Sequence, residues 1–306
     1  MNRIIAFFKS ILSAIKRRFC RIQCPVQWDA SVNPFSLPYK NFKLKKILGY
    51  SRTSNHVFRV EGIYQHKKVN AYIKVAEKSN ARIKKEIETL SMLKLDVLPQ
   101  IIDHDDNKDR FVVTLAKEGA PLHRILGNNA DGASAEYMPK FGKMLASLHQ
   151  LKGNFDPVIQ RPYFDIPALA EFEKVNLQFV YDYLVKNKPK TINKCFCHGD
   201  FNYSNVLWQN KQISAVLDLE LSGIGNREYD IAWAMAVRPK QSFLITPQEI
   251  QLFLDGYRTL GDLNIEHLKY YLVLVYSHFY LLIAKNEVYQ KYILRVFYTI
   301  CLETKS

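Results

Sequence analysis

The side chains best suited to chemistry gather in one short segment of the chain. His198, Gly199 and Asp200 stand together, Asn205 follows five residues after Asp200, and Asp218 lies 13 residues beyond Asn205. Transfer of a phosphoryl group to a hydroxyl needs a group that accepts or orients the hydroxyl proton, and oxygen ligands that hold magnesium against the phosphates. Asp200 can serve the first purpose, and Asn205 and Asp218 can serve the second. The spacing therefore predicts a phosphoryl-transfer site.

Two short apolar runs, at residues 206–208 and 213–217, separate the candidate magnesium ligands. Their composition is typical of paired strands, which would return Asn205 and Asp218 to one place. Earlier in the chain, runs rich in β-branched and aromatic residues predict strands at 43–48, 57–60, 69–75 and 110–115. A helix is expected over residues 80–95, because Ile83, Ile87 and Leu90 recur at helical spacing.

The chain beyond these strands is predicted to be mostly helical. An apolar stripe indicates a helix over 137–151, and residues 246–249 have the pattern of a capping box with proline at the first helical position. Residues 265–300 are rich in Leu, Tyr and Phe and are expected to form buried helices. A small sheet with one helix, then a connector and a helical part, describes an α+β fold of the protein-kinase-like kind.

The segment around Asp200 reads His-Gly-Asp, four residues, then Asn, with a later Asp-x-Glu. In this it resembles the aminoglycoside phosphotransferase/choline kinase-like family. The likeness covers most of residues 43–235. It includes the stretch from Gly49 to Val60, the Ala-Tyr-Ile-Lys-Val strand ending at Val75, Leu148-His149, and Tyr229-Asp230-Ile231-Ala232.

This resemblance implies a bilobal fold and a role for each matched residue. Asp200 would be the catalytic base, Asn205 and Asp218 would bind Mg²⁺, and Lys74 would contact the phosphates of ATP or GTP. Leu115, Ala116 and Lys117 would form the hinge whose backbone contacts the purine. The chain would divide into a basic helix and linker at 1–39, a nucleotide-binding N-lobe at 40–116, and a catalytic and acceptor-binding C-lobe at 117–306.

The family pairs its strand lysine with a helix glutamate, and two candidates exist here. At about 100° per residue, Glu86 flanks the apolar stripe of the predicted helix, while Glu88 points to the opposite side. Glu86 is therefore the expected partner of Lys74.

The match has departures and open roles. Relatives often carry more glycine where this chain has only Gly49, so the donors to phosphate would be Ser51, Thr53 and Ser54. Asn202 and Ser204 stand where the family often has His and Gly, and the choline kinases proper usually have Asn in place of Gly199. Glu220 is either a second metal contact or a polar residue that closes its strand. His198 and Asp230 are expected to be structural, with Asp230 a hydrogen-bond acceptor that braces the catalytic loop.

The composition limits the possible partners. The chain has 306 residues and a net charge of +14, from 43 basic and 29 acidic side chains. Such a balance favours anionic partners, but no recognised nucleic-acid-binding module accompanies it, so nucleic acid is not expected. Five cysteines are an odd number for a disulfide framework and indicate a reducing, cytoplasmic compartment. Cys195 and Cys197 would face one side of a short strand as small core residues, and the alternative, a metal cluster, lacks the usual zinc spacing.

The first 24 residues form a basic amphipathic pattern with two interpretations. Six apolar residues recur at helical spacing, six positive charges accompany them, and no acid is present. Such a helix can lie on an anionic membrane surface, which would place the protein at the inner face of the membrane. Alternatively, its apolar stripe packs on its own domain.

The acceptor is left open between three classes. An aminoglycoside would need an acidic pocket, for which Glu228, Asp255 and Asp262 are few. A choline-like or ethanolamine-like amine would need an aromatic cage, to which Trp233, Tyr229 and Tyr257 could contribute. Lipid-linked or phosphorylated sugars suit the positive charge best. The hypothesis of another class is a membrane-recruited nucleotide-binding scaffold without catalysis.

Overall fold

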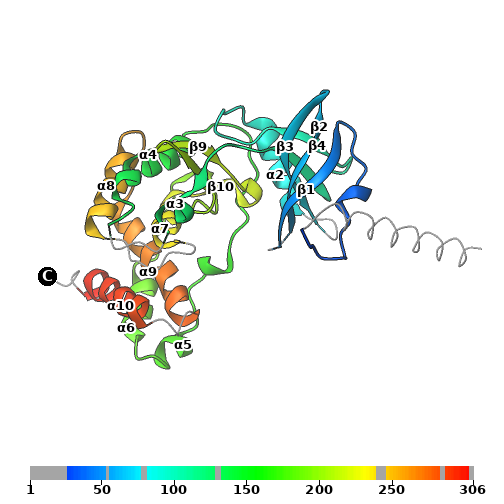
Figure 1. The fold of residues 1–306 in the computed structure, drawn as a ribbon. Helices are drawn as coiled ribbons and strands as arrows, with labels where there is room; N and C mark the ends of the chain where they lie inside the picture. Colours follow the sequence, from blue (N-terminus) through cyan, green and yellow to red (C-terminus); the bar gives the residue numbers. More distant parts are fainter. Residues whose placement is uncertain are drawn as a thin grey trace, which may run out of the picture. The chain divides into compact units, whose positions relative to one another are not determined.

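The computed structural model describes residues 26–52, 55–76, 81–127, 132–238, 246–282 and 287–302. The chain divides into two compact units, Met1–Lys117 and Glu118–Ser306 (Figure 1). The predicted helix over residues 1–24 lies outside the described residues, as do Thr53 and Ser54. Their expected contacts with membrane and phosphate remain predictions.

The N-terminal unit is a five-stranded antiparallel sheet with the order β1-β2-β3-β5-β4 and one helix. Gln65 and His66 connect β2 to β3 with φ angles of 48° and 63°, as in the two-residue turns that suit the strand twist. The elements are β1 (Phe42–Arg52), β2 (His56–Tyr64), β3 (Lys67–Val75), α2 (Ala81–Met92), β4 (Ile101–His104) and β5 (Phe111–Leu115).

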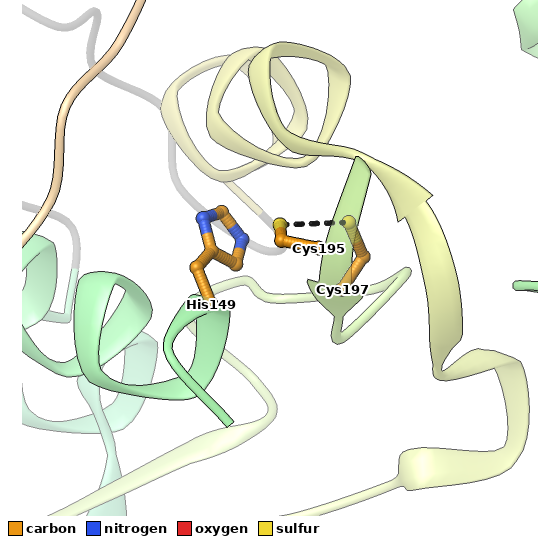
Figure 2. Close-up of side chains that lie close together, drawn as sticks. All are labelled: His149, Cys195 and Cys197. Carbon is orange, nitrogen blue, oxygen red and sulfur yellow. Dashed lines mark hydrogen bonds between the residues drawn. The ribbon is translucent and has the colours of Figure 1, made fainter. Parts of the chain in front are cut away.

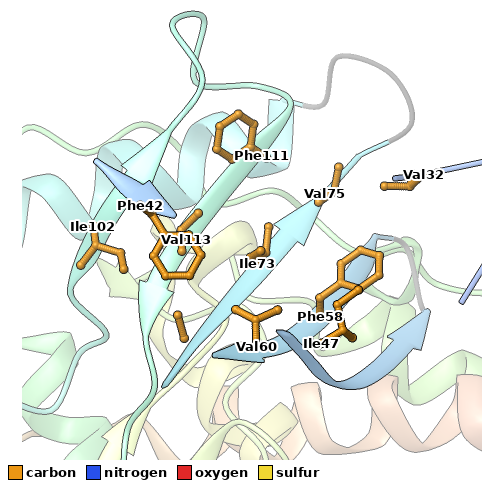
Figure 3. Close-up of a cluster of buried hydrophobic side chains, with 11 residues drawn as sticks. Val32, Phe42, Ile47, Phe58, Val60, Ile73, Val75, Ile102, Phe111 and Val113 are labelled. Atoms are coloured by element: carbon orange, nitrogen blue, oxygen red, sulfur yellow. The ribbon is translucent and has the colours of Figure 1, made fainter. Parts of the chain in front are cut away.

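Alternation along the strands gives the sheet two apolar faces. Ile83 and Ile87 of α2 pack with Val112 of β5 on one face. The other face carries a larger cluster of eleven buried side chains, which Figure 3 shows across the strands. Val32 belongs to this cluster, and Trp28 packs against it. Residues 26–39, interpreted from the sequence as part of a linker, therefore contribute to the core of this unit, because their apolar side chains cover the sheet.

The C-terminal unit contains two small sheets and most of the helices. One sheet has the order β6-β8-β9 and the other pairs β10 with β7. Helix α4 packs on α8, and α7 packs on α9. The elements are β6 (Ala120–Pro121), α3 (Leu122–Leu126), α4 (Met138–His149), α5 (Leu169–Glu173), α6 (Gln178–Lys186), β7 (Lys194–Cys197), β8 (Val206–Gln209), β9 (Gln212–Val216), β10 (Gly223–Asn226), α7 (Arg227–Ala236), α8 (Pro247–Arg258), α9 (Ile265–Leu282) and α10 (Glu287–Leu302), with short 3₁₀ turns at Pro34–Ser36, Ala135–Tyr137, Pro162–Phe164 and Leu219–Leu221.

The predicted capping box starts α8. Thr246 accepts a hydrogen bond from the Glu249 N–H, and Glu249 accepts from the Thr246 N–H at 2.7 Å. The Glu249 carboxylate is also buried against Ser134, whose N–H and Oγ–H both donate to it. Ser134 in turn accepts a hydrogen bond from the Tyr203 hydroxyl at 2.8 Å. Through these hydrogen bonds, the cap links α8 to the loop that follows Asp200.

The predicted α+β class is confirmed: the first unit is a small antiparallel sheet with one helix, and the second is mostly helical. Among the helices that the structure describes, none has the length and apolar character needed to cross a membrane.

Candidate active site

A two-residue hairpin brings the candidate magnesium ligands together. Asn210 and Lys211 connect β8 to β9 with φ angles of 50° and 59°. At the open end of the hairpin, the Leu217 N–H donates to the Asn205 carbonyl at 2.8 Å. Asn205 precedes β8 and Asp218 follows β9, so the predicted strand pairing is confirmed. The chain turns away sharply at Asp218, whose φ is 65°.

The carboxylate of Asp200 is held in one orientation by its own loop. The Nδ2 group of Asn205 donates to Oδ2 at 3.1 Å, and that of Asn202 donates to Oδ1 at 2.9 Å. Both amides also donate to the Asp200 carbonyl, at 2.9 and 3.1 Å. Trp233 of α7 donates its indole N–H to Oδ1 at 2.8 Å. Asn202 is one of the departures from the family pattern, and in this chain it supports the predicted base directly.

One neighbour of Asp200 was not predicted from the sequence. Arg161 comes from the loop before the 3₁₀ turn Pro162–Phe164, and its Nη2 lies 2.7 Å from Asp200 Oδ1. Its Nε–H donates to the Gly199 carbonyl at 3.2 Å, and its guanidinium lies 4.3 Å from the centre of the Trp233 ring. No motif marks a loop arginine 39 residues upstream of the aspartate, so this contact appears only in the folded chain.

The donor set beside Asp200 suits a hard cation. Because Asn205 uses its Nδ2 for Asp200, its carbonyl Oδ1 is the atom left for a cation. Carboxylate oxygens of Asp218 and Glu220 lie within 4.8 Å of each other. Oxygen ligands of this kind are those that Mg²⁺ takes, usually with waters and substrate phosphates completing the shell. Glu220 lies beside Asp218, and its role as a second metal contact stays a prediction.

A fully buried carboxylate supports the catalytic loop from behind. Asp230 accepts the N–H groups of His198 and Gly199 at 2.8 and 2.9 Å. It also lies 3.1 Å from His149 Nε2, and the other ring nitrogen of His149 is bonded to the Tyr257 hydroxyl at 2.7 Å. Burial alone would lower the pKa of His149, but its hydrogen bonds to Asp230 and Cys195 raise that pKa to about 9. His149 is therefore an imidazolium at neutral pH and can donate from both nitrogens.

Gly199 and His198 fix the shape of the loop itself. Gly199 has a φ of 79°, and a Cβ at this position would lie 2.9 Å from the Leu221 carbonyl. A side chain there would clash and would be strained. The His198 ring accepts from the Asp200 N–H at 3.2 Å and lies 3.0 Å from the Leu217 carbonyl. It therefore links the catalytic loop to the end of the β8–β9 hairpin.

Cys195 and Cys197 face the same side of β7, and His149 lies beside them (Figure 2). Their sulfurs are 3.8 Å apart, and one donor atom from each of these three residues falls within 4.8 Å of the others. Since both nitrogens of His149 are already bonded to Tyr257 and Asp230, the ring has no lone pair for a metal. The interpretation of the cysteines as core residues fits this arrangement better than a metal cluster.

Cys195 is expected to react as a thiolate near neutral pH. The hydrogen bond from Cys197 lowers the pKa of Cys195, and His149 adds to this effect, while burial raises the pKa of Cys197. Above its lowered pKa, Cys195 is already deprotonated, so alkylation by iodoacetamide should change little between pH 6.5 and 8.5. An ordinary thiol would react about fiftyfold faster at the higher pH.

Peptide mass spectrometry of the alkylated protein measures this dependence residue by residue. Cys301 is the internal control, because burial raises its pKa to about 12 and it should remain unlabelled at both pH values. A labelling rate of Cys195 that rises with pH like that of an ordinary thiol would contradict the assignment.

In the N-terminal unit, the structure places Lys74 against Glu86. Lys74 lies on β3, and its Nζ is 2.6 Å from Glu86 Oε2 on α2. Their side chains are only 15% and 8% exposed. Glu88, the alternative partner, is 41% exposed and lies 4.0 Å from Lys84. The glutamate that helical spacing predicted as the partner of Lys74 is therefore the one that the structure pairs with it.

The other predicted nucleotide contacts lie at two edges of this unit. Ser51 is exposed near the end of β1, opposite Val57 of β2. In the predicted hinge, the Leu115 N–H donates to the Gln100 carbonyl and the Ala116 N–H to the Asn70 carbonyl. Within the described residues, the Lys117 N–H has no backbone partner. The contact of the Lys117 N–H with a purine stays a prediction.

Exchange of Glu86 for glutamine is expected to weaken nucleotide use. A hydrogen bond between charged groups contributes roughly 1.5–3 kcal/mol, so kcat/KM for the nucleotide should fall about ten- to a hundredfold. Glu88→Gln is the matched control on the same helix, and it should leave kcat/KM nearly unchanged because exposed pairs contribute little. Equal effects of the two substitutions would show that Glu86 has no special role.

A family model described as the phosphotransferase enzyme family matches residues 51–263 of the 306. The chain belongs to the phosphotransferase enzyme family. Membership confirms the resemblance stated from the sequence, and the matched range includes Lys74, Asp200, Asn205 and Asp218.

Individual members of the phosphotransferase enzyme family are similar over shorter stretches. Aminoglycoside 3'-phosphotransferase of Enterococcus faecalis is 34% identical over 95 residues, which cover 31% of this chain and 34% of the relative. N-acetylmuramate/N-acetylglucosamine kinase of Caulobacter vibrioides is 24% identical over 168 residues, which cover 49% of this chain and 44% of the relative. The chain spans between a third and just under half of these curated relatives.

Solved structures of phosphotransferases share the fold. The streptomycin–ATP ternary complex of APH(2″)-IIa matches with a TM-score of 0.54 and 14% identity, over 77% of this chain and 84% of that one. At this identity the likeness establishes the fold, and it agrees with the predicted protein-kinase-like class.

Proposed function

We propose that this protein transfers the γ-phosphoryl group of ATP to a hydroxyl of a small molecule or glycan, with Mg²⁺ as cofactor. The observation that carries the proposal is the Asp200–Asn205 contact at the open end of the β8–β9 hairpin, with Asp218 on the adjoining strand end. This arrangement supports the proposal, because phosphoryl transfer needs a fixed carboxylate and oxygen ligands for a metal ion close to it.

Each residue has a defined part in the proposed reaction. Asp200 orients the acceptor hydroxyl and takes its proton, and its fixed position supplies most of its effect. Asn205, Asp218 and Glu220 would hold the magnesium ion, which neutralises charge on the phosphates when bound. Lys74, positioned by Glu86, would hold the phosphates from the N-terminal unit.

The acceptor is proposed to be a sugar hydroxyl. One relative is named as a kinase of N-acetylmuramate and N-acetylglucosamine, and others are named as aminoglycoside phosphotransferases. Glu228, considered above for an acidic pocket, is fully buried and accepts hydrogen bonds from Asn193 and the Asn264 N–H. Tyr257, considered for a choline cage, is also fully buried and bonded to His149. Both positions favour the sugar over the antibiotic and the amine.

The test is ATP turnover by the purified full chain with Mg²⁺, against N-acetylglucosamine, N-acetylmuramate, kanamycin, choline and ethanolamine. Stimulation by a sugar, with a phosphorylated product seen by mass spectrometry, is the expected result. Stimulation by kanamycin or choline alone would overturn the choice of acceptor. Nucleotide binding with no phosphorylated acceptor would overturn the proposed activity.

A further inference from the structure

We propose that Arg161 forms an anion-binding subsite for the acceptor, so that the preferred acceptor is a hydroxyl compound that also carries a carboxylate or phosphate. This inference rests on the proposed phosphotransfer and names the charge of the acceptor. Its basis is the cationic side chain of Arg161, which lies 2.7 Å from the Asp200 carboxylate.

The guanidinium of Arg161 has a fixed position. It is fixed at the catalytic loop by the Gly199 carbonyl, by Asp200 and by the Trp233 ring. Any hydroxyl that reaches Asp200 comes close to this positive charge. The side chains of Arg161 and Asp200 are 23% and 21% exposed, so solvent reaches both.

Arg161 has unused hydrogen-bonding capacity. A guanidinium has five N–H donors in a planar fork, a shape that matches carboxylate and phosphate oxygens. Here Nε and Nη2 are engaged by Gly199 and Asp200. In the part of the chain that the structure describes, Nη1 has no partner. The guanidinium can therefore bind a second anionic group while it keeps its contact with Asp200.

The surroundings of Arg161 are unfavourable for a cationic acceptor. Arg161 already lies over the face of Trp233, which is the surface that a quaternary ammonium would use. Asp255, one of the acids considered for a polycation, lies on α8 and contacts Gln251 and Arg258. The positive charge of Arg161 would repel a cationic acceptor close to Asp200, whereas it would attract an anionic acceptor.

A matched pair of acceptors tests this inference. N-acetylmuramate and N-acetylglucosamine share the sugar ring and differ by a carboxylate-bearing group, and N-acetylglucosamine 6-phosphate supplies a phosphate instead. The wild-type chain should have a higher kcat/KM for at least one anionic sugar than for the neutral one. The anionic sugar that is preferred shows whether the subsite takes carboxylate or phosphate.

The variants Arg161→Gln and Arg161→Lys separate the subsite from a purely structural role. The ratio of kcat/KM for the anionic sugar to that for the neutral sugar should fall about ten- to a hundredfold in Arg161→Gln, the range for one charged hydrogen bond. Arg161→Lys should recover part of the ratio. Arg258→Gln, an exposed arginine of α8, should leave the ratio unchanged. A structural role of Arg161 would change both sugars equally, and that result would overturn the inference.

A binding measurement keeps the test independent of turnover. Calorimetry in the presence of Mg²⁺ and a non-hydrolysable ATP analogue should show that N-acetylmuramate or N-acetylglucosamine 6-phosphate binds to the wild-type chain. The same sugar should bind to Arg161→Gln at least tenfold more weakly. Equal binding by both proteins overturns the subsite even if the enzyme is active. Arginine-dependent binding without any phosphorylated product would uphold the subsite and overturn the proposed activity.

Discussion

Replacement of Asp200 by asparagine is expected to lower kcat for acceptor phosphorylation by roughly 10²–10⁴-fold, the usual contribution of a positioned base. The amide has nearly the shape of the carboxylate but cannot take the hydroxyl proton. Nucleotide should still bind, because the proposed phosphate contacts and metal ligands lie on other residues. Steady-state kinetics with the best acceptor, together with calorimetric titration of the nucleotide, measure the two effects separately.

Asp255→Asn is the matched control for this substitution. It makes the same chemical change on an exposed side chain of α8, and kcat should not change. Full turnover by Asp200→Asn would show that this carboxylate is not the base. If neither the wild type nor the variant phosphorylates any acceptor while both bind nucleotide, the scaffold hypothesis gains support.

Replacement of Asp230 by asparagine is expected to lower the free energy of unfolding by roughly 3–5 kcal/mol, as when one partner of a buried charge pair is removed. The amide carries no charge to pair with the His149 imidazolium. Its NH₂ group would also face one of the two backbone N–H donors from His198 and Gly199. Urea unfolding of the C-terminal unit near pH 7 measures the loss.

A second substitution tests the cause of that loss. His149→Gln removes the cation, so the combined variant His149→Gln/Asp230→Asn should be less destabilised than the sum of the two single changes. A simple sum would show that the pair is not coupled. Asp255→Asn again serves as the control, because an exposed carboxylate contributes little to stability.

The parts of the site that the sequence predicted are those that local chemistry determines. The His-Gly-Asp-x4-Asn spacing and the two apolar runs after it indicated the loop and its hairpin, and the pairing of Asn205 with Leu217 confirms the hairpin. Helical periodicity also chose Glu86 over Glu88, because the face of a helix follows from spacing alone. In each case the interacting residues are close in sequence or lie on one regular element.

The parts that the sequence did not predict depend on contacts between distant segments. Arg161 reaches Asp200 from an irregular loop, and irregular backbone gives no periodic pattern from which a direction could be inferred. The pairing of β7 with β10 joins two four-residue strands 25 residues apart, each too short for a clear alternation. The packing of residues 26–39 was missed because their prolines and polar residues resemble those of a linker.

The Glu249 cap at the start of α8 limits where this chain could be recombined with its relatives. Its carboxylate serves the first turn of the helix and, through Ser134, the hydroxyl of Tyr203 three residues after Asp200. A chimera that exchanged α8 alone would replace the cap without its partners. Crossover points for domain shuffling should therefore keep residues 134–258 from one parent, so that the whole of α8 and the loop are inherited together.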